Sequence, residues 1–267
     1  MLQKIKKCAS YINERINIDT DTGIILGTGL GKLAEQIDII HKIRYEDLPH
    51  FPISTVEGHN GQFIYGKLGN KYVIALQGRF HYYEGYSMEE VGFPVRVLKE
   101  LGVNRLLISN AAGAMNPSYE VGDLVIIKDH INMFPTNPLI GKNHEELGPR
   151  FPDMSEAYDK EMIIEAQDIA KRENIDIHTG VYVGVSGPTY ETPAEYKFFR
   201  IIGGDIVGMS TVPEVIVARH AGIKCFGISV VTDSGAPGKL KEISHAEVQR
   251  IGELSQPRMA EIFKKII

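Results

Sequence analysis

The densest group of reactive side chains lies in QGRFHYYEGY, residues 77–86, directly after an apolar run. Arg79, His81 and three tyrosines fall within these ten residues. An arginine offers a planar fork of donors that matches phosphate oxygens, and a histidine two positions later shares its face if the strand continues. The segment therefore indicates an anion site, and its alternative is a solvated loop with aromatic residues in the core.

A second candidate anion site is the glycine-rich GTGLG at residues 27–31, which also follows an apolar run. Glycines let a backbone approach a ligand closely, and the Thr28 hydroxyl together with backbone N–H groups can hold an anion. Lys32 stands where the dinucleotide fingerprint needs its last glycine, and the Gly-Lys-Ser/Thr of a P-loop does not follow. The segment argues against a nicotinamide dehydrogenase, and a plain tight turn remains its alternative.

Three further segments place small or polar residues beside predicted elements. SNAAGA, residues 109–114, has side chains small enough for a ligand, or equally a helix, to lie against the backbone. In GMST, Ser210 and the N–H groups of the following helix favour an anion, while Thr211 could simply cap that helix. His59, within GHNG, belongs either to a turn or to an anion site.

Tyr190 and Glu191 immediately precede a predicted helix that begins after Thr192. An aromatic ring can stack on a flat heterocycle, and a carboxylate can hydrogen-bond to the edge of that heterocycle. The pair therefore suggests a site for a planar ring, and its alternative is a solvated loop carboxylate.

The elements that must position these residues alternate between strands and helices. Short β-branched runs predict buried strands that begin at Gly23, Tyr72, Arg105, Asp123 and Lys224. Ser/Thr-x-x-Glu patterns predict helix starts at Ser87, Thr192, Thr211 and Ser244. Apolar spacing predicts one more helix at the N-terminus, and residues 133–155, with four prolines, predict a long surface loop. The pattern indicates an α/β fold with one domain over residues 1–267, because no repeat or linker divides it.

The composition predicts a folded, cytoplasmic protein. Of its 267 residues, 43% are hydrophobic and 24% charged, and the net charge of −5 comes without a basic cluster for a nucleic acid. Cys8 and Cys225 lie far apart without metal-ligand spacing, which predicts buried thiols in a reducing compartment rather than a disulfide framework. No apolar run approaches about 18 residues, so neither a membrane span nor a signal peptide is expected.

Together these segments resemble the trimeric purine nucleoside phosphorylases, whose superfamily also includes the methylthioadenosine phosphorylases. The resemblance runs from about Gly23 to about His245, and its motifs follow the family's order and approximate spacing: GHNGQ, QGRFHYYEGY, SNAAGAMNP, KDHIN, RFPDMSEAYD, SGPTYETPAEY and VGMSTVPEVIVARHAGI. It implies a single α/β domain with a central mixed, distorted β-sheet flanked by helices. It also implies an enzyme of purine salvage without a metal or organic cofactor.

Residue by residue, the resemblance implies three subsites. Phosphate is expected at Thr28, His59, Arg79, His81, Ser210 and the backbone N–H of Ala111. Ribose is expected at Tyr83, Met209, His245 and, reaching over from a neighbouring subunit of a homotrimer, Phe151. The purine base is expected at Ala112, Tyr190, Glu191, Val207 and Asp233. His81, Glu191 and Asp233 are the expected catalytic residues.

The reaction implied is phosphorolysis of inosine, guanosine and their deoxy forms to the free base and (deoxy)ribose 1-phosphate. Phosphate held against C1′ of ribose would attack from the face opposite the base, so inversion at C1′ is expected. The leaving purine needs a hydrogen bond or a proton near its five-membered ring, and Asp233 and Glu191 are the candidates.

Asp233 departs from the family's pattern, which usually has asparagine at this position in the 6-oxopurine enzymes. An ionised aspartate cannot donate to O6, whereas it suits the amino group of a 6-aminopurine, as in methylthioadenosine phosphorylases. Adenosine or methylthioadenosine phosphorolysis is therefore the alternative function, unless burial keeps Asp233 protonated. His245 and the segment GRFH resemble the nucleoside enzymes instead, because a histidine there favours the ribose 5′-hydroxyl over a thioether.

A nucleoside-binding module without catalysis is the alternative of a different class. Loss of a phosphate ligand would be its signature, and Thr28, Arg79, His81 and Ser210 are all present. A nucleoside hydrolase is disfavoured because the sequence has no aspartate-rich metal motif near its start.

Overall fold

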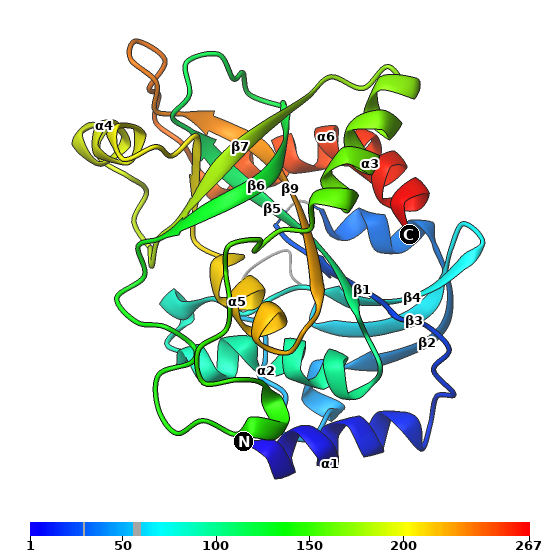
Figure 1. Ribbon diagram of the computed structural model, residues 1–267. Coiled ribbons are helices and arrows are strands. Elements are labelled where there is room, and N and C mark those ends of the chain that lie inside the picture. Colours follow the sequence, from blue (N-terminus) through cyan, green and yellow to red (C-terminus); the bar gives the residue numbers. More distant parts are fainter. Residues whose placement is uncertain (29, 56–59) are drawn as a thin grey trace.

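The computed structural model describes residues 1–28, 30–55 and 60–267 (Figure 1). Nine strands of the described chain form one sheet: β1 (Thr22–Leu26), β2 (Ile37–Arg44), β3 (Gln62–Leu68), β4 (Lys71–Gln77), β5 (Arg105–Ala114), β6 (Leu124–Asn132), β7 (Ile177–Gly184), β8 (Ile206–Gly208) and β9 (Lys224–Ser234). The α-helices are α1 (Leu2–Asn13), α2 (Met88–Glu100), α3 (Lys160–Arg172), α4 (Pro193–Ile201), α5 (Val212–His220) and α6 (His245–Ile266).

The sheet is mixed and closes partly on itself. Its order is β2-β3-β4-β1-β5-β8-β7-β6-β9, and β9 also pairs with β5 in parallel. Strands β5, β8, β7, β6 and β9 therefore form a closed ring, while β1 to β4 extend from it as an open sheet. The chain is a single α/β domain with a distorted mixed sheet, so the fold predicted from the sequence is confirmed.

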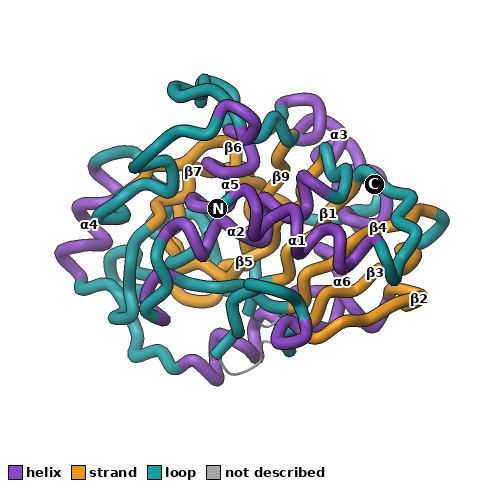
Figure 2. The backbone as a smooth tube through the Cα atoms, turned by 90° about the horizontal axis from the view of Figure 1, so that it is seen from below, coloured by secondary structure: helices purple, strands orange, loops and turns teal. Residues whose placement is uncertain are grey.

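Helices cover both faces of this sheet because its central strands are apolar on both faces. In β5, Leu106 and Ile108 join a core cluster with α1, α2 and α5, whereas Leu107 joins a second cluster with α3 and α6. This alternation is the two-residue period of a strand. Figure 2 looks onto the first of these layers, in which α1 and α2 lie across the sheet.

All five predicted strands are present, and the sequence analysis missed β2, β3, β7 and β8. Two of these lacked a clear apolar signal. Strand β8 has only three residues, and β2 is an edge strand whose side chains are mostly exposed. The predicted N-terminal helix is α1, which buries Ile5, Cys8 and Ile12 on one face. Residues 133–155 are irregular apart from one 3-10 turn, Glu145–Leu147.

All four predicted helix starts are confirmed, but only three of them have the expected side-chain cap. The side chains of Ser87, Thr192 and Ser244 each accept a hydrogen bond from the N–H three residues later. Helix α5 does begin after Thr211, but that side chain makes no capping bond, because its backbone is left-handed with φ 70°. The Thr211 hydroxyl instead accepts a hydrogen bond from Asn110 Nδ2 at 2.9 Å.

Both cysteines are buried thiols, in agreement with the sequence analysis, and burial raises the pKa of Cys8 and of Cys225 to about 12. Among the described residues, no helix combines the length and apolar character needed to cross a bilayer.

Ile262→Ala should lower the free energy of unfolding by about 2–5 kcal/mol, because this α6 side chain is fully buried against the sheet. Leu254→Ala, on the same helix but 65% exposed, is the matched control and should change it by less than about 0.5 kcal/mol. Urea unfolding followed by circular dichroism measures both. Equal losses would contradict the two faces assigned to α6.

Candidate active site

One cavity of about 380 Å³ lies where several strands end. Strands β1, β4, β5 and β9 are mutually parallel neighbours, so their carboxyl ends meet at one edge of the sheet. Ligand sites of α/β sheets form at this edge, beyond the strand ends. The cavity is lined by thirteen of the residues predicted from the sequence: Thr28, Arg79, His81, Tyr83, Ala111, Ala112, Tyr190, Glu191, Val207, Met209, Ser210, Asp233 and His245.

The two remaining predicted residues are His59 and Phe151. His59 lies outside the residues that the structure describes. Phe151 is 88% exposed and does not line the cavity of its own chain.

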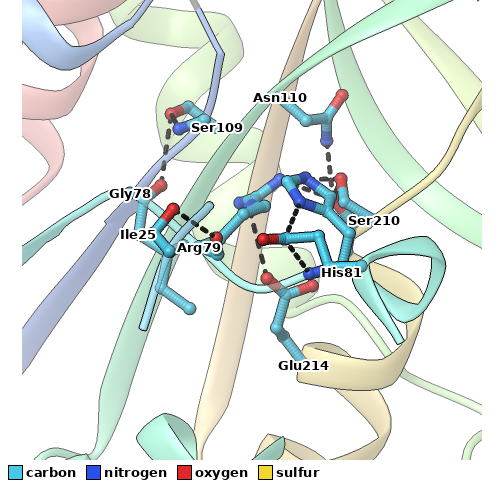
Figure 3. A network of polar contacts seen from close by, with 12 residues as sticks. Ile25, Gly78, Arg79, His81, Ser109, Asn110, Ser210 and Glu214 are labelled. Carbon is cyan, nitrogen blue, oxygen red and sulfur yellow. Dashed lines mark hydrogen bonds and ion pairs between the residues drawn. The ribbon is translucent and has the colours of Figure 1, made fainter. Parts of the chain in front are cut away.

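A buried ion pair forms one end of the cavity (Figure 3). Arg79 follows β4, and its Nε lies 3.2 Å from Oε1 of Glu214, on α5, with both side chains less than 5% exposed. Arg79 Nη1 donates to the hydroxyl of Ser210 at 2.7 Å. The pair fixes a cation beside a hydroxyl at the cavity wall, which is the chemistry that an oxyanion requires.

His81 is held next to this cation by a carboxylate that the sequence analysis did not assign. Oε1 of Glu84 accepts from the backbone N–H of His81 and from its Nδ1, both at 2.8 Å. Burial lowers the pKa of His81, so the ring is neutral near pH 7 with its Nδ1 proton directed at Glu84. Burial opposes ionisation of Glu84, but hydrogen bonds from His81 and Thr55 outweigh it and lower its pKa to about 2.

Arg79 and His81 both line the cavity, but not as residues on one face of a continuing strand. Strand β4 ends at Gln77, and Gly78 has φ 113°, so the alternation of a strand does not continue to His81. His81 instead stands at the start of a 3-10 turn, Tyr82–Glu84, and its ring stacks on Tyr83 with centroids 4.7 Å apart.

We expected residues 109–114 to follow a strand, but they belong to β5 itself. At Gly113, the absence of a side chain is explained by the close approach of neighbouring polar groups. A Cβ there would stand 2.7 Å from Oδ2 of Asp233 and 3.0 Å from the hydroxyl of Tyr196. The β5–β9 pairing also shifts register between Ala112 and Gly113, and such a bulge re-aims side chains next to a site.

Carboxyl groups and aromatic rings form the other end of the cavity. Asp233 accepts from Tyr196 at 2.7 Å and from Thr232 at 3.0 Å. Burial raises the pKa of Asp233. Burial, together with the charge of Asp233, raises the pKa of Glu191 to about 7. The two ends of the cavity therefore differ in chemistry, with an ion-paired guanidinium and a hydroxyl at one and acids of raised pKa at the other.

The sequence analysis missed three residues that organise the site: Glu84, Tyr196 and Glu214. Glu84 lies inside the segment already selected, three residues after His81, and that spacing was its only signal. Glu214 was interpreted as part of a helix start, which hid its partnership with Arg79. Tyr196 occupies an ordinary helical position, and only the packing of α4 brings it to Asp233.

Among the described residues, no group of three or more His, Cys, Asp or Glu side chains is placed to hold a metal ion. The arrangement fits a small molecule with an oxyanion at one end and a flat polar ring at the other.

Comparison with known proteins agrees with this chemistry. The family model described as "Phosphorylase superfamily" matches residues 21–267. The chain belongs to the phosphorylase superfamily. Among relatives, purine nucleoside phosphorylase 1 of Bacillus subtilis is 52% identical over 267 residues, covering 100% of this chain and 98% of the relative.

Two solved structures of this superfamily share the fold almost completely. The purine nucleoside phosphorylase of Schistosoma mansoni in complex with adenosine superposes with a TM-score of 0.93 at 43% identity, covering 99% of this chain and 96% of the other. The same organism's enzyme in complex with inosine gives a TM-score of 0.91 at 42% identity, with coverage of 99% and 95%.

Glu214→Gln should lower the free energy of unfolding by about 3–5 kcal/mol, because it removes the carboxylate opposite the buried Arg79 guanidinium. Glu261→Gln is the matched control, since Glu261 pairs with Lys265 on the surface, and its cost should stay below about 1 kcal/mol. Urea unfolding at pH 7 compares the two. Similar costs would show that the Arg79 pair contributes no more than a surface pair.

Proposed function

We propose that this protein is a purine nucleoside phosphorylase, which uses inorganic phosphate to convert inosine, guanosine and their deoxy forms to the free base and (deoxy)ribose 1-phosphate. The observation that carries the proposal is the charge pattern of the cavity. The buried, ion-paired Arg79 and Ser210 form an anion site at one end, and Glu191, Asp233 and Tyr190 form a polar aromatic site at the other.

The subsites are assigned in the same order. Phosphate would bind at Thr28, Arg79, His81, Ser210 and the N–H of Ala111, with His59 as a further ligand. Ribose would lie between the ends, against Tyr83, Met209 and His245. The base would bind at Ala112, Tyr190, Glu191, Val207 and Asp233. All of these that the structure describes line one cavity, which supports the assignment.

Phosphate is the nucleophile in this mechanism, so no covalent enzyme intermediate is needed. Arg79 and Ser210 hold it against C1′, which replaces a bimolecular encounter by an aligned one. As the glycosidic bond breaks, the phosphate charge stabilises the oxocarbenium-like carbon, and a proton or hydrogen bond from Asp233 or Glu191 stabilises the leaving purine. Attack opposite the base converts a β-nucleoside into an α-sugar phosphate.

His81 contributes as a neutral, oriented donor or acceptor beside the phosphate. Glu84 fixes its ring, and burial keeps it uncharged near neutral pH. Glu84 therefore acts as a positioning residue for the phosphate end of the cavity.

Assembly as a cytoplasmic homotrimer in purine salvage, without a cofactor, is part of the proposal. Phe151 supports the trimer, because its side chain is 88% exposed and is therefore accessible to the neighbouring subunit that the family resemblance implies. In a ring of three subunits it would cover the ribose of its neighbour.

Base release from inosine and guanosine should require phosphate and yield an α-sugar 1-phosphate, assayed by chromatography and phosphorus NMR. Arg79→Lys should raise the KM for phosphate at least about tenfold, because an ammonium cannot reproduce the planar fork. Arg250→Lys, on the exposed side of α6, is the control and should leave this KM unchanged. Base release at equal rates without phosphate, or a β-sugar product, would reject phosphorolysis with inversion.

Phe151→Ala should raise the KM for inosine about tenfold or more while leaving the KM for phosphate near the wild-type value. Co-expression of this variant with Arg79→Lys should give more activity than the two separate proteins, because mixed trimers contain complete sites. Sedimentation velocity checks the assembly. A monomer that keeps full activity would contradict the role of a neighbouring subunit.

A further inference from the structure

The base end of the cavity contains a buried tyrosine that is hydrogen-bonded to a carboxyl group. The Tyr196 hydroxyl donates to Oδ2 of Asp233 at 2.7 Å, and the residue is only 3% exposed. Its ring lies directly on Gly235, where a Cβ would come within 2.1 to 2.3 Å of ring carbons. Gly113 leaves space for the hydroxyl and the carboxylate in the same way. Two glycines from β5 and the end of β9 thus make room for this one contact.

A second carboxyl group, that of Glu191, lines the same cavity and interacts with the same tyrosine. Burial raises the pKa of each carboxyl, and the charge of Asp233 raises that of Glu191 further. Two interacting acids lose their protons in separate steps, and the raised pKa of Glu191, about 7, allows the pair to hold one proton around neutral pH. Burial and the charges of both acids also raise the pKa of Tyr196, so its hydroxyl remains a donor.

Purines differ at two adjacent positions that a pair of acids can recognise. A 6-oxopurine presents a donor at N1 and an acceptor at O6, whereas a 6-aminopurine presents an acceptor at N1 and a donor at N6. One protonated and one ionised carboxyl offer a donor and an acceptor in either order. An asparagine side chain in a fixed orientation offers its NH₂ donor and its oxygen acceptor in only one order.

Resting on the function proposed above, we propose that Glu191 and Asp233 share one proton, with Tyr196 as the positioning residue, so that one site complements both 6-oxo- and 6-aminopurine nucleosides. With inosine or guanosine, Asp233 holds the proton and donates to O6, while ionised Glu191 accepts from N1–H. With adenosine, Glu191 holds the proton and donates to N1, while ionised Asp233 accepts from the amino group. The pair has a charge of −1 in both complexes, so no net proton is taken up.

Tyr196 decides how easily the proton leaves Asp233. Its hydrogen bond to Oδ2 favours the ionised form, as does the hydrogen bond from the Thr232 hydroxyl to Oδ1. Because Tyr196 donates to Oδ2, Oδ1 is the oxygen that carries the proton in the neutral acid, and it can still accept from Thr232. The other titratable groups around the pair are Tyr190 and Glu195, which flank the start of α4, and His245 of α6, which lines the same cavity.

The test is kcat/KM for inosine and for adenosine, each with phosphate, between pH 5 and 9. The wild-type protein should cleave both, with bell-shaped profiles that share their acid and alkaline limbs, because the one-proton state serves both bases. Tyr196→Phe should lower the adenosine-to-inosine ratio about tenfold and move the alkaline limb upward, since Asp233 then keeps its proton to higher pH.

Asp233→Asn should lower the ratio further, because Tyr196 would bind the amide oxygen and leave the amide N–H₂ facing the base. Tyr119→Phe is the matched control: this hydroxyl donates to Thr179, away from the cavity, and its loss should leave the ratio unchanged. If Tyr196→Phe lowered the activities toward inosine and adenosine equally, Tyr196 would have only a structural role, and the inference would be overturned.

The inference and the proposed function fail in different ways. Phosphate-dependent cleavage of inosine with adenosine slower by more than about a thousandfold at every pH would overturn the shared proton and leave the phosphorylase intact. An unchanged adenosine-to-inosine ratio of kcat/KM in Asp233→Asn would also overturn the shared proton and leave the phosphorylase function intact. Failure to cleave either nucleoside in the presence of phosphate would reject the function itself.

Discussion

The ion pair between Arg79 and Glu214 is the constraint on which the rest of the site depends. Both side chains are buried, so each charge needs the other, and the pair ties the end of β4 to the first turn of α5. Ser210 joins the same network from the turn after β8. Asn110 of β5 bonds to Thr211 in the same turn. The end of β4, the turn after β8, the first turn of α5 and strand β5 must therefore all dock correctly before the anion end of the cavity exists.

The opposite end of the cavity contains two acids, Asp233 and Glu191. Their hydrogen-bond partners among the described side chains are hydroxyl groups rather than cations. Tyr196 and Thr232 supply the hydrogen bonds that Asp233 needs in a water-poor site. A substrate with negative charge at one end and a polar ring at the other is complementary to this gradient. The glycosidic bond of a bound nucleoside would then lie between the two ends, where charge develops during cleavage.

The proposed base site is where this chain differs from the pattern that its motifs resemble. A buried carboxyl can act as donor or acceptor, depending on a proton, whereas an amide offers both groups at once in a fixed orientation. The pair of Glu191 and Asp233 therefore makes substrate choice a matter of proton location. Gly113 and Gly235 belong to this device, because any side chain there would displace Tyr196 from Asp233.

Local apolar runs were enough to predict the α/β class and the central strands, and the family resemblance of contiguous motifs was enough to predict thirteen cavity residues. The partners of those residues depend on how distant segments pack together. Arg79 meets Ser210 across 131 positions, and Tyr196 meets Asp233 across 37, so no local pattern encodes either contact. Thr211 and Glu214 show most clearly what a local pattern cannot predict. Their spacing fits a helix cap, yet in the folded chain Thr211 bonds to Asn110 and Glu214 pairs with Arg79. Burying charged and polar groups requires specific neighbours, and folding alone brings those neighbours together.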